Sequence, residues 1–156
     1  MTTEAFRAIA IDPGGTTGIV EAEKARGKLL LTVSQERLTP YGFLKFLQDK
    51  ADRRTILLVE DFEFRPKSPA GLRMISAHLI GVAMAYSEFR ECPLIMQKAS
   101  YAKSGFYRNE AALKKAGVHV PGMPHGMDAM RHFLQWFAFG PGFKYNKGYI
   151  LQVRKG

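Results

Sequence analysis

Four residues of this sequence have side chains that can bind metal ions or transfer protons, and each stands where the chain should turn or change element. Asp12 ends the apolar run "AIAID" and precedes Pro-Gly-Gly, and Glu60 ends the run "ILLVE". His125 and Asp128 lie three residues apart in "PHGMDAM", so they share one face of a helix or its first turn. Three carboxylates and one imidazole form an oxygen-rich ligand set, which suits Mg²⁺ or Mn²⁺ better than zinc.

This ligand set fits the hydrolysis of phosphodiesters. Two divalent ions about 3.5–4 Å apart can activate a water molecule and stabilise the leaving 3′ oxygen. We therefore take Asp12, Glu60, His125 and Asp128 as candidate catalytic and metal-binding residues, with two ions in the site. His125 is either a ligand or a proton-transfer group, since its spacing fits both roles. A structural interpretation also stays open, because Asp-Pro-Gly is common in turns and an acid or a capping residue at a helix start is ordinary.

These side chains can meet only if the strands that carry them end at one edge of a sheet. Apolar runs predict strands over residues 6–12, 18–22, 29–33, 53–61 and 92–97, and helices from Pro40 and over 74–87, 108–116 and 127–139. The order strand–strand–strand–helix–strand–helix–strand–helix predicts an α/β domain with a five-stranded mixed sheet flanked by helices. The fourth strand can then lie beside the first, about 4.8 Å away, which brings Asp12 and Glu60 together.

The composition is that of one globular domain of 156 residues, with 46% hydrophobic and 24% charged residues. We divide the chain into a domain over residues 1–141 and a basic tail over 142–156, in which "GYILQV" can form an edge strand. The one cysteine, Cys92, excludes an internal disulfide and suits a reducing compartment. There is no signal-peptide pattern, and the longest uncharged stretch, 74–87, is too short to cross a bilayer. We therefore expect a cytoplasmic protein with no membrane partner.

The charge is unevenly distributed along the chain. The formal net charge is +9, of which residues 1–60 contribute +1 (9 Lys and Arg against 8 Asp and Glu) and residues 61–156 contribute +8 (14 against 6). A basic surface of this kind favours a polyanionic partner such as a nucleic acid, through counterion release and electrostatic steering. The alternative is a basic surface that serves solubility alone.

The motifs "IAIDPGGTTG", "ILLVEDFEF" and "HGMDAMRHFLQW", in this order and spacing, resemble the RuvC family of Holliday-junction resolvases, and most closely its small bacteriophage members. The resemblance covers about residues 6–139 and implies an RNase H-like fold. It also implies that Asp12, Glu60, His125 and Asp128 bind divalent metals and that the chain is a structure-selective endodeoxyribonuclease of DNA recombination. The substrate would be branched DNA, without a small-molecule cofactor, in the cytoplasm of a bacterial host if the protein is phage-encoded.

The resemblance further implies a homodimer, formed through the helix after Glu60, here residues 72–88. The stretch 74–87 is uncharged on all sides, and a helix that buries only one face does not explain this. A helix at a dimer interface would have this pattern, and so would a helix in the centre of the core. The family opens junctions with an aromatic residue of the loop after the glutamate strand. Phe62 and Phe64 lie in that loop, but at a different spacing. The candidate nucleic-acid contacts are Phe62, Phe64, Arg65, Lys67, Arg73, Lys98, Lys103 and Arg108.

Three other functions are compatible with parts of the sequence. A RuvC-like domain can bind branched nucleic acid without cutting it, although a pure binder gains nothing from acids that face phosphates. An RNase H or YqgF-like nuclease would act on RNA, and the sequence does not separate the two substrates. "IDPGGTTG" also resembles the phosphate loop of sugar kinases and actin-like ATPases, but 156 residues leave no room for their second lobe.

Overall fold

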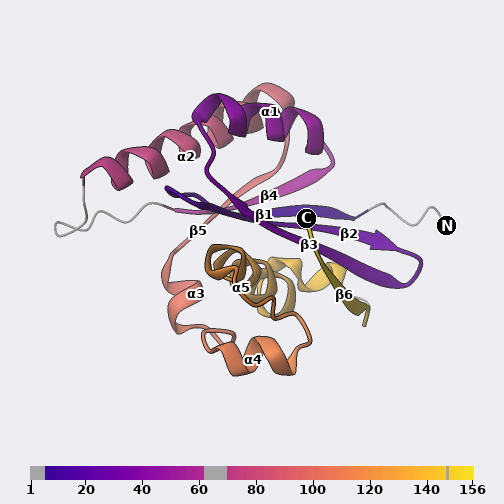
Figure 1. Ribbon diagram of the computed structural model, residues 1–156. Coiled ribbons are helices and arrows are strands. Elements are labelled where there is room, and N and C mark those ends of the chain that lie inside the picture. The colour runs from indigo at the N-terminus through magenta and orange to yellow at the C-terminus, as the bar shows by residue number, and fades with distance from the viewer. Residues whose placement is uncertain (1–5, 62–69, 147) are drawn as a thin grey trace.

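The computed structural model describes residues 6–61, 70–146 and 148–156 (Figure 1). The described residues form one six-stranded mixed sheet, in the order β5-β4-β1-β2-β3-β6. Its strands are β1 (Arg7–Asp12), β2 (Thr17–Ala25), β3 (Lys28–Glu36), β4 (Thr55–Glu60), β5 (Leu94–Gln97) and β6 (Ile150–Lys155). The sheet is the scaffold on which every candidate site residue is placed.

The strand pairing brings the carboxyl ends of β1 and β4 together. β1, β2 and β3 form an antiparallel meander, and β4 runs parallel to β1 with Ile11 opposite Val59. The next residue along β1 is Asp12, and the next residue along β4 is Glu60. The predicted neighbourhood of the first and fourth strands is confirmed.

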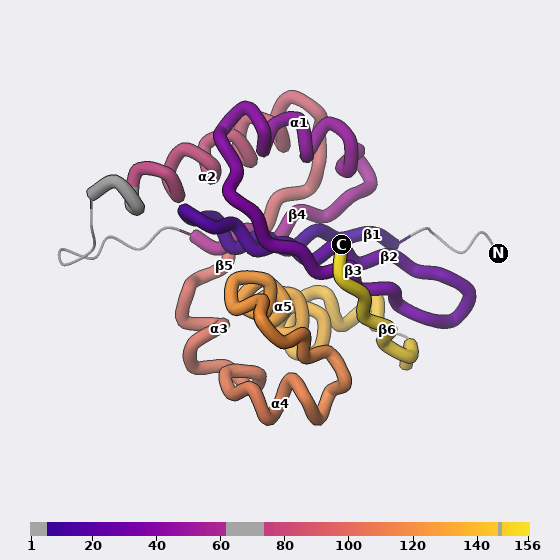
Figure 2. Tube along the Cα trace, in the orientation of Figure 1, coloured from indigo at the N-terminus to yellow at the C-terminus, as the bar shows by residue number. Residues whose placement is uncertain are grey.

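The predicted number of five strands is wrong by one. β6, within the predicted basic tail, pairs in parallel with β3 at the edge of the sheet, and the path of the chain is visible in Figure 2. β6 alternates between half-buried and exposed residues and has a partner far away in the sequence, so its local pattern is weak. The division of the chain at residues 141 and 142 stays a prediction.

Helices cover both faces of the sheet (Figure 1). α1 (Pro40–Lys50) and α2 (Ala70–Arg90) lie on one face, and α5 (Pro124–Phe139) lies on the other with α3 (Ser100–Ser104), α4 (Glu110–Lys115) and the 3₁₀ helix η1 (Pro141–Tyr145). Thr39 caps α1 by accepting a hydrogen bond from the backbone N–H of Gly42. No helix within the described residues is long and apolar enough to cross a membrane.

Each face of the sheet has its own hydrophobic core, and β1 contributes to both. Ala8 and Ala10 belong to the core beneath α5, whereas Ile9 and Ile11 belong to the core beneath α1 and α2. A strand buried on both faces reads as a continuous apolar run, which is why β1 is recognisable in the sequence. Its last residue, Asp12, follows four fully buried apolar residues and lies at the edge of this core.

Candidate metal centre and its cleft

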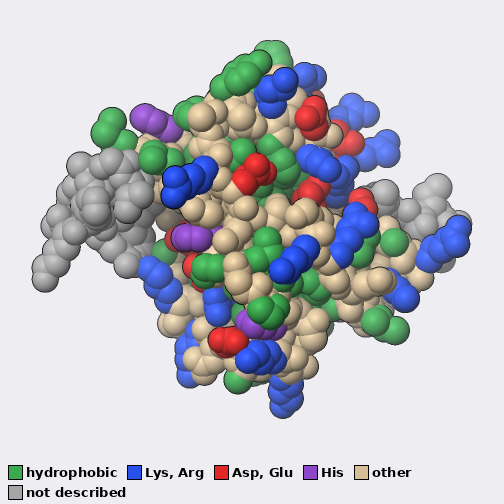
Figure 3. All heavy atoms as spheres, in the orientation of Figure 1, with side chains coloured by type: hydrophobic (Ala, Val, Ile, Leu, Met, Phe, Trp, Pro, Cys, Tyr) green, Lys and Arg blue, Asp and Glu red, His purple; other side chains and the backbone are tan. Residues whose placement is uncertain are grey.

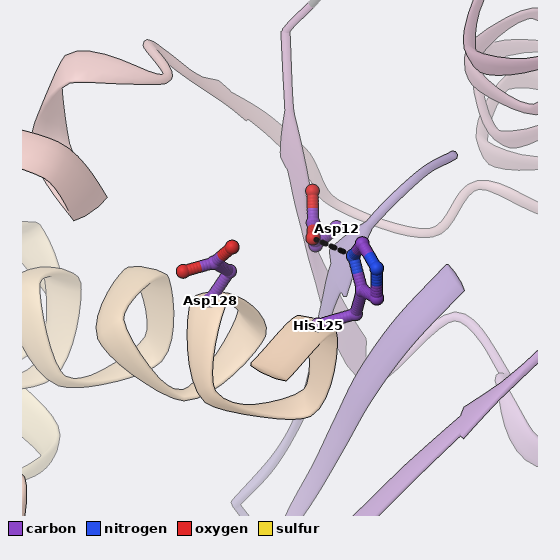
Figure 4. A group of neighbouring side chains, drawn as sticks. All are labelled: Asp12, His125 and Asp128. Carbon is purple, nitrogen blue, oxygen red and sulfur yellow. Dashed lines mark ion pairs between the residues drawn. The ribbon is translucent and has the colours of Figure 1, made fainter. Parts of the chain in front are cut away.

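The structure brings three of the four candidate site residues into one cluster. Asp12 lies at the end of β1, and His125 and Asp128 lie in the first two turns of α5 (Figure 4). Ligand atoms of these three residues all lie within 4.8 Å of one another. His125 Nδ1 is 3.5 Å from Asp12 Oδ2. Because opposite ligands of Mg²⁺ are about 4.2 Å apart, twice the usual ligand distance, this spacing is close to that of a single binding site.

Glu60 lines the same cleft but is oriented by a different partner. Its Oε2 lies 2.7 Å from Nε2 of His132, and the His132 side chain is fully buried. Glu60 also contacts the carboxyl group of Asp12 by a hydrogen bond. Glu60 therefore stands between the three-residue cluster and the buried imidazole.

The electrostatics of the cluster favour a positive ion. The pKa of Asp12 is raised to about 8, chiefly by burial and then by the negative charges of Glu60 and Asp128 and the hydrogen bond to Glu60. Lys103 acts in the opposite sense. Without a cation, Asp12 thus holds a proton near neutral pH. Oxygen and imidazole donors gathered at this density fit a divalent metal such as Mg²⁺ or Mn²⁺.

The start of α5 is fixed by contacts from the sheet, which set the positions of His125 and Asp128. The side-chain oxygen of Gln35, in β3, accepts hydrogen bonds from the backbone N–H groups of His125 and Gly126, at 3.1 and 3.2 Å. It thereby satisfies two of the donors that a helix start leaves open. Gly18, opposite Asp12 in β2, lies directly under the helix, and a Cβ there would collide with the carbonyl of His125.

These contacts remove the structural interpretation of the two residues on α5. His125 does not cap the helix, because Met123 occupies the cap position and Gln35 supplies the capping oxygen. The first turn of α5 contains no acid, so Asp128 is not placed there to favour the helix dipole. Asp128 instead accepts a hydrogen bond from Arg131 Nη1 at 2.7 Å.

The cluster lies in a cleft of about 730 Å³ that is open to solvent. Pro13, Gly14, Gly15 and Thr16 form one wall, and Ile75 and Ser76 of α2 lie at another. The cleft also contains Arg37 and Lys103, two cations that can contact an anionic substrate. A backbone wall with two glycines leaves room for a bulky ligand to approach the carboxylates.

The other candidate nucleic-acid contacts are distributed unevenly. Lys98, Lys103 and Arg108 are all exposed, and Lys103 alone of these three lines the cleft. Phe62, Phe64, Arg65 and Lys67 lie outside the described residues, as does the side chain of Arg73. These residues remain sequence predictions.

Sequence reasoning missed four residues around the site, namely Gln35, Arg37, Arg131 and His132. For His132 a signal was present. It stands four residues after Asp128 and seven after His125, so it lies on the same side of the helix, and it is a polar residue within a buried apolar set. No sequence signal indicated Gln35 or Arg37, because these residues reach the site from β3 and from the chain directly after it.

Comparisons with known proteins agree with this architecture. No protein-family model matches the chain, and no curated protein matches it either. A solved structure of T. thermophilus RuvC in complex with Holliday junction substrate is similar, at 16% identity and a TM-score of 0.64, covering 92% of this chain and 96% of that one. A second Thermus thermophilus RuvC structure has 16% identity and a TM-score of 0.59, covering 85% of this chain and 95% of that one. This chain therefore has the RuvC type of RNase H-like fold, as its three motifs predicted.

Proposed function

We propose that this protein is a divalent-metal-dependent endonuclease that cuts branched DNA, such as four-way junctions, by hydrolysis of the phosphodiester. The observation that carries the proposal is the cluster of Asp12, His125 and Asp128, with Glu60 beside it, at the strand ends of a RuvC-like fold. A cluster of acids in the cleft of a chain with a net charge of +9 is explained if these acids bind a cation. The basic residues then hold the DNA backbone, and the acids hold the metal ions.

Asp12, Glu60, His125 and Asp128 would hold the ions. When bound, Mg²⁺ or Mn²⁺ supplies activation of the attacking water and stabilisation of the leaving oxygen. The chain itself orients the phosphate through Lys103 and Arg37, which lie in the cleft. His125, half-exposed and 3.5 Å from Asp12, is placed either to bind an ion or to transfer a proton.

Branched DNA is proposed as the substrate for two reasons. One similar structure contains RuvC in complex with Holliday junction substrate, and we extend that substrate class to this chain. The charge of this chain independently favours a nucleic acid, because Lys and Arg exceed Asp and Glu by 8 in residues 61–156 (14 against 6).

We further propose a homodimer formed through the outer face of α2. Leu79, Ala83 and Tyr86 bury the inner face of the helix in the core. The outer face carries a stripe of exposed residues at helical spacing, consisting of Met74, His78, Gly81, Met84 and Ala85. Met74 and Met84 are more than half exposed, and the described residues leave open space around the Cα of Gly81. An uncharged stripe with a small residue at its centre fits close packing against a second copy.

The test of the activity is a cleavage assay on labelled four-way junction, flap, duplex and single-stranded DNA and on an RNA–DNA hybrid. Each substrate is incubated with Mg²⁺, Mn²⁺ or EDTA, using wild type, Asp12→Asn and, as a matched control, Asp49→Asn on the exposed surface of α1. We expect metal-dependent cutting of branched DNA that Asp12→Asn abolishes and Asp49→Asn preserves. DNA binding should survive in both variants, because it depends on the basic residues.

Other results would assign a different function. Tight binding of branched DNA without cutting in either metal would favour a non-cleaving module, and preferred cutting of the hybrid would favour an RNA-acting nuclease. Cutting by Asp12→Asn at the wild-type rate would refute the assignment of the site.

The dimer is tested by light scattering of Gly81→Arg, which we expect to be monomeric, beside Gln48→Arg on the exposed surface of α1, which should stay dimeric.

A further inference from the structure

A patch of three aromatic rings lies on the surface away from the metal cleft. Phe106 and Tyr107 follow α3, and Phe139 is the last residue of α5. The ring centroids are 5.0 Å apart for Phe106 and Tyr107, 5.5 Å for Phe106 and Phe139, and 6.0 Å for Tyr107 and Phe139. Phe106 is 64% and Phe139 58% exposed, whereas Tyr107 is half-buried against the core. We call these three residues the aromatic patch.

Contiguous exposed rings of this kind indicate a binding surface. Single exposed apolar side chains are common, but adjacent aromatic rings left in water forgo a large burial energy. The rings come from segments that are distant in the sequence, so tertiary structure brings them together. Contact with a ligand would remove the rings from water and provide the burial free energy that folding alone does not provide.

The patch is held firmly and is connected to the acidic cluster. Arg131 Nε donates a hydrogen bond to the backbone carbonyl of Tyr107 at 3.0 Å, and Arg131 Nη1 donates to Asp128. Gly105, just before the patch, packs so closely that a Cβ there would collide with the carbonyl of Tyr101 and the side chain of Gln135. One guanidinium thus links the loop of the patch to a candidate metal ligand, and the loop is seated tightly on α5.

The charge around the patch selects a polyanion as its ligand. Residues 98–115 contain five basic residues, Lys98, Lys103, Arg108, Lys114 and Lys115, against one acid, Glu110. Figure 3 shows Lys and Arg side chains over α3 and α4, as over other parts of this face. Lys103 lines the metal cleft, and Phe106 follows it by three residues. Lys114 pairs with Glu110 at 2.8 Å, and a protein partner with an apolar surface alone would add no counter-charge for the other four cations.

The spacing between the patch and the acids fits a strand of nucleic acid. Phe139 follows Asp128 by eleven residues within α5. At about 1.5 Å per residue this is roughly 16 Å along the helix axis. A strand with stacked bases advances about 3.4 Å per nucleotide, so roughly five nucleotides would span this distance.

We propose that the aromatic patch is a stacking platform for unpaired bases of the strand whose phosphate lies in the cleft. Phenyl rings have no hydrogen-bonding groups, so they stack on any base and read no sequence. Lys103 and Arg108 would contact the backbone between the bases and the cleft. The inference rests on the proposed function insofar as both require a nucleic acid, and it adds a preference for substrates with unpaired nucleotides.

The experiment compares DNA affinities in EDTA, where no cutting occurs. Fluorescence anisotropy measures Kd for a duplex and for the same duplex with a short single-stranded gap. The variants are the Phe106→Ala, Phe139→Ala double substitution and the corresponding double substitution to Leu, which keeps apolar bulk but removes the rings. Tyr41→Ala is the matched control, because it removes a 69% exposed ring from α1 on the other face of the sheet. Thermal unfolding verifies that every variant is folded.

We expect both double variants to raise Kd for the gapped DNA about tenfold or more and Kd for the duplex less than about twofold. Tenfold corresponds to about 1.4 kcal/mol, within the range for one stacked base. Tyr41→Ala should leave both values unchanged. Equal losses on both DNAs, no loss on either, or full affinity in the Leu variant would overturn the platform and leave a protein partner as the ligand of the patch.

These results are separable from those of the cleavage assay. A protein that cuts branched DNA but shows no gap-specific loss keeps the proposed function and loses the platform. A protein that binds gapped DNA through the patch but never cuts keeps the platform and loses the nuclease. A wild type that binds neither DNA refutes both.

Discussion

Replacing Asp12 by Asn should stabilise the metal-free protein, and the gain should depend on pH. The pKa of Asp12 is raised in the folded chain from 3.8 to about 8, chiefly by burial and by Glu60 and Asp128. The folded state therefore binds this proton more tightly than the unfolded state does. Stability is greatest below pH 3.8 and is lost as the pH rises through the interval to about 8. Asn cannot ionise, so the variant escapes this loss.

The magnitude follows from the shift. The rise of this pKa from 3.8 to about 8 corresponds to at most about 6 kcal/mol above pH 8. The cleft is open to water and its side chains can relax, so we expect about 2–4 kcal/mol. At about 2–4 °C per kcal/mol for a chain of this size, Tm should rise by about 5–15 °C.

The assay is thermal unfolding of wild type and Asp12→Asn in EDTA at pH 5 and at pH 8.5, with Asp49→Asn as the control. We expect the advantage of Asp12→Asn to be small at pH 5 and full at pH 8.5, and Asp49→Asn to show none. Adding Mn²⁺ should raise the Tm of wild type more than that of Asp12→Asn, because the metal ligand is lost in the variant. A variant less stable than wild type at pH 8.5, or an advantage independent of pH, would show that ionisation of Asp12 does not destabilise the folded protein.

Substitutions at three further residues test the groups that position the site. His132→Leu should lower Mn²⁺ affinity, measured by calorimetry, because Glu60 loses its 2.7 Å partner, and His132→Gln, which keeps a donor at that end of the side chain, should restore most of it. Gln35→Ala removes two capping bonds from α5 and should cost about 1–2 kcal/mol in urea unfolding, with weaker Mn²⁺ binding; unchanged values would mean that the cap is dispensable. Gly18→Ala should destabilise the fold far more than Gly27→Ala, because a Cβ at Gly18 would meet the carbonyl of His125, whereas a Cβ at Gly27 meets no atom and costs only the strain of its φ of +78°; equal effects would contradict the packing described.

Much of the fold could be predicted because its signals are local. The runs ending at Asp12 and Glu60 are apolar throughout, since β1 and β4 are buried on both faces, and Thr39-Pro40 marks a helix start that the structure contains. The predicted helix over 108–116 corresponds to α4, but the short α3 before it has no such signal, because five residues give no periodicity. β6 was foreseen only as a possible edge strand, since its partner lies in β3.

The available chemistry, three carboxylates and an imidazole at element ends in a basic chain, and the order of the elements that carry these groups follow from local residue patterns. Which of these groups meet depends on how the elements pack. His132 contacts Glu60 and Gln35 caps α5 because the helix packs across the sheet, and the aromatic patch forms because the end of α5 meets the loop after α3. The physical reason is that periodicity and capping depend on neighbours along the chain. Distances between side chains of different elements instead depend on the packing of the whole core.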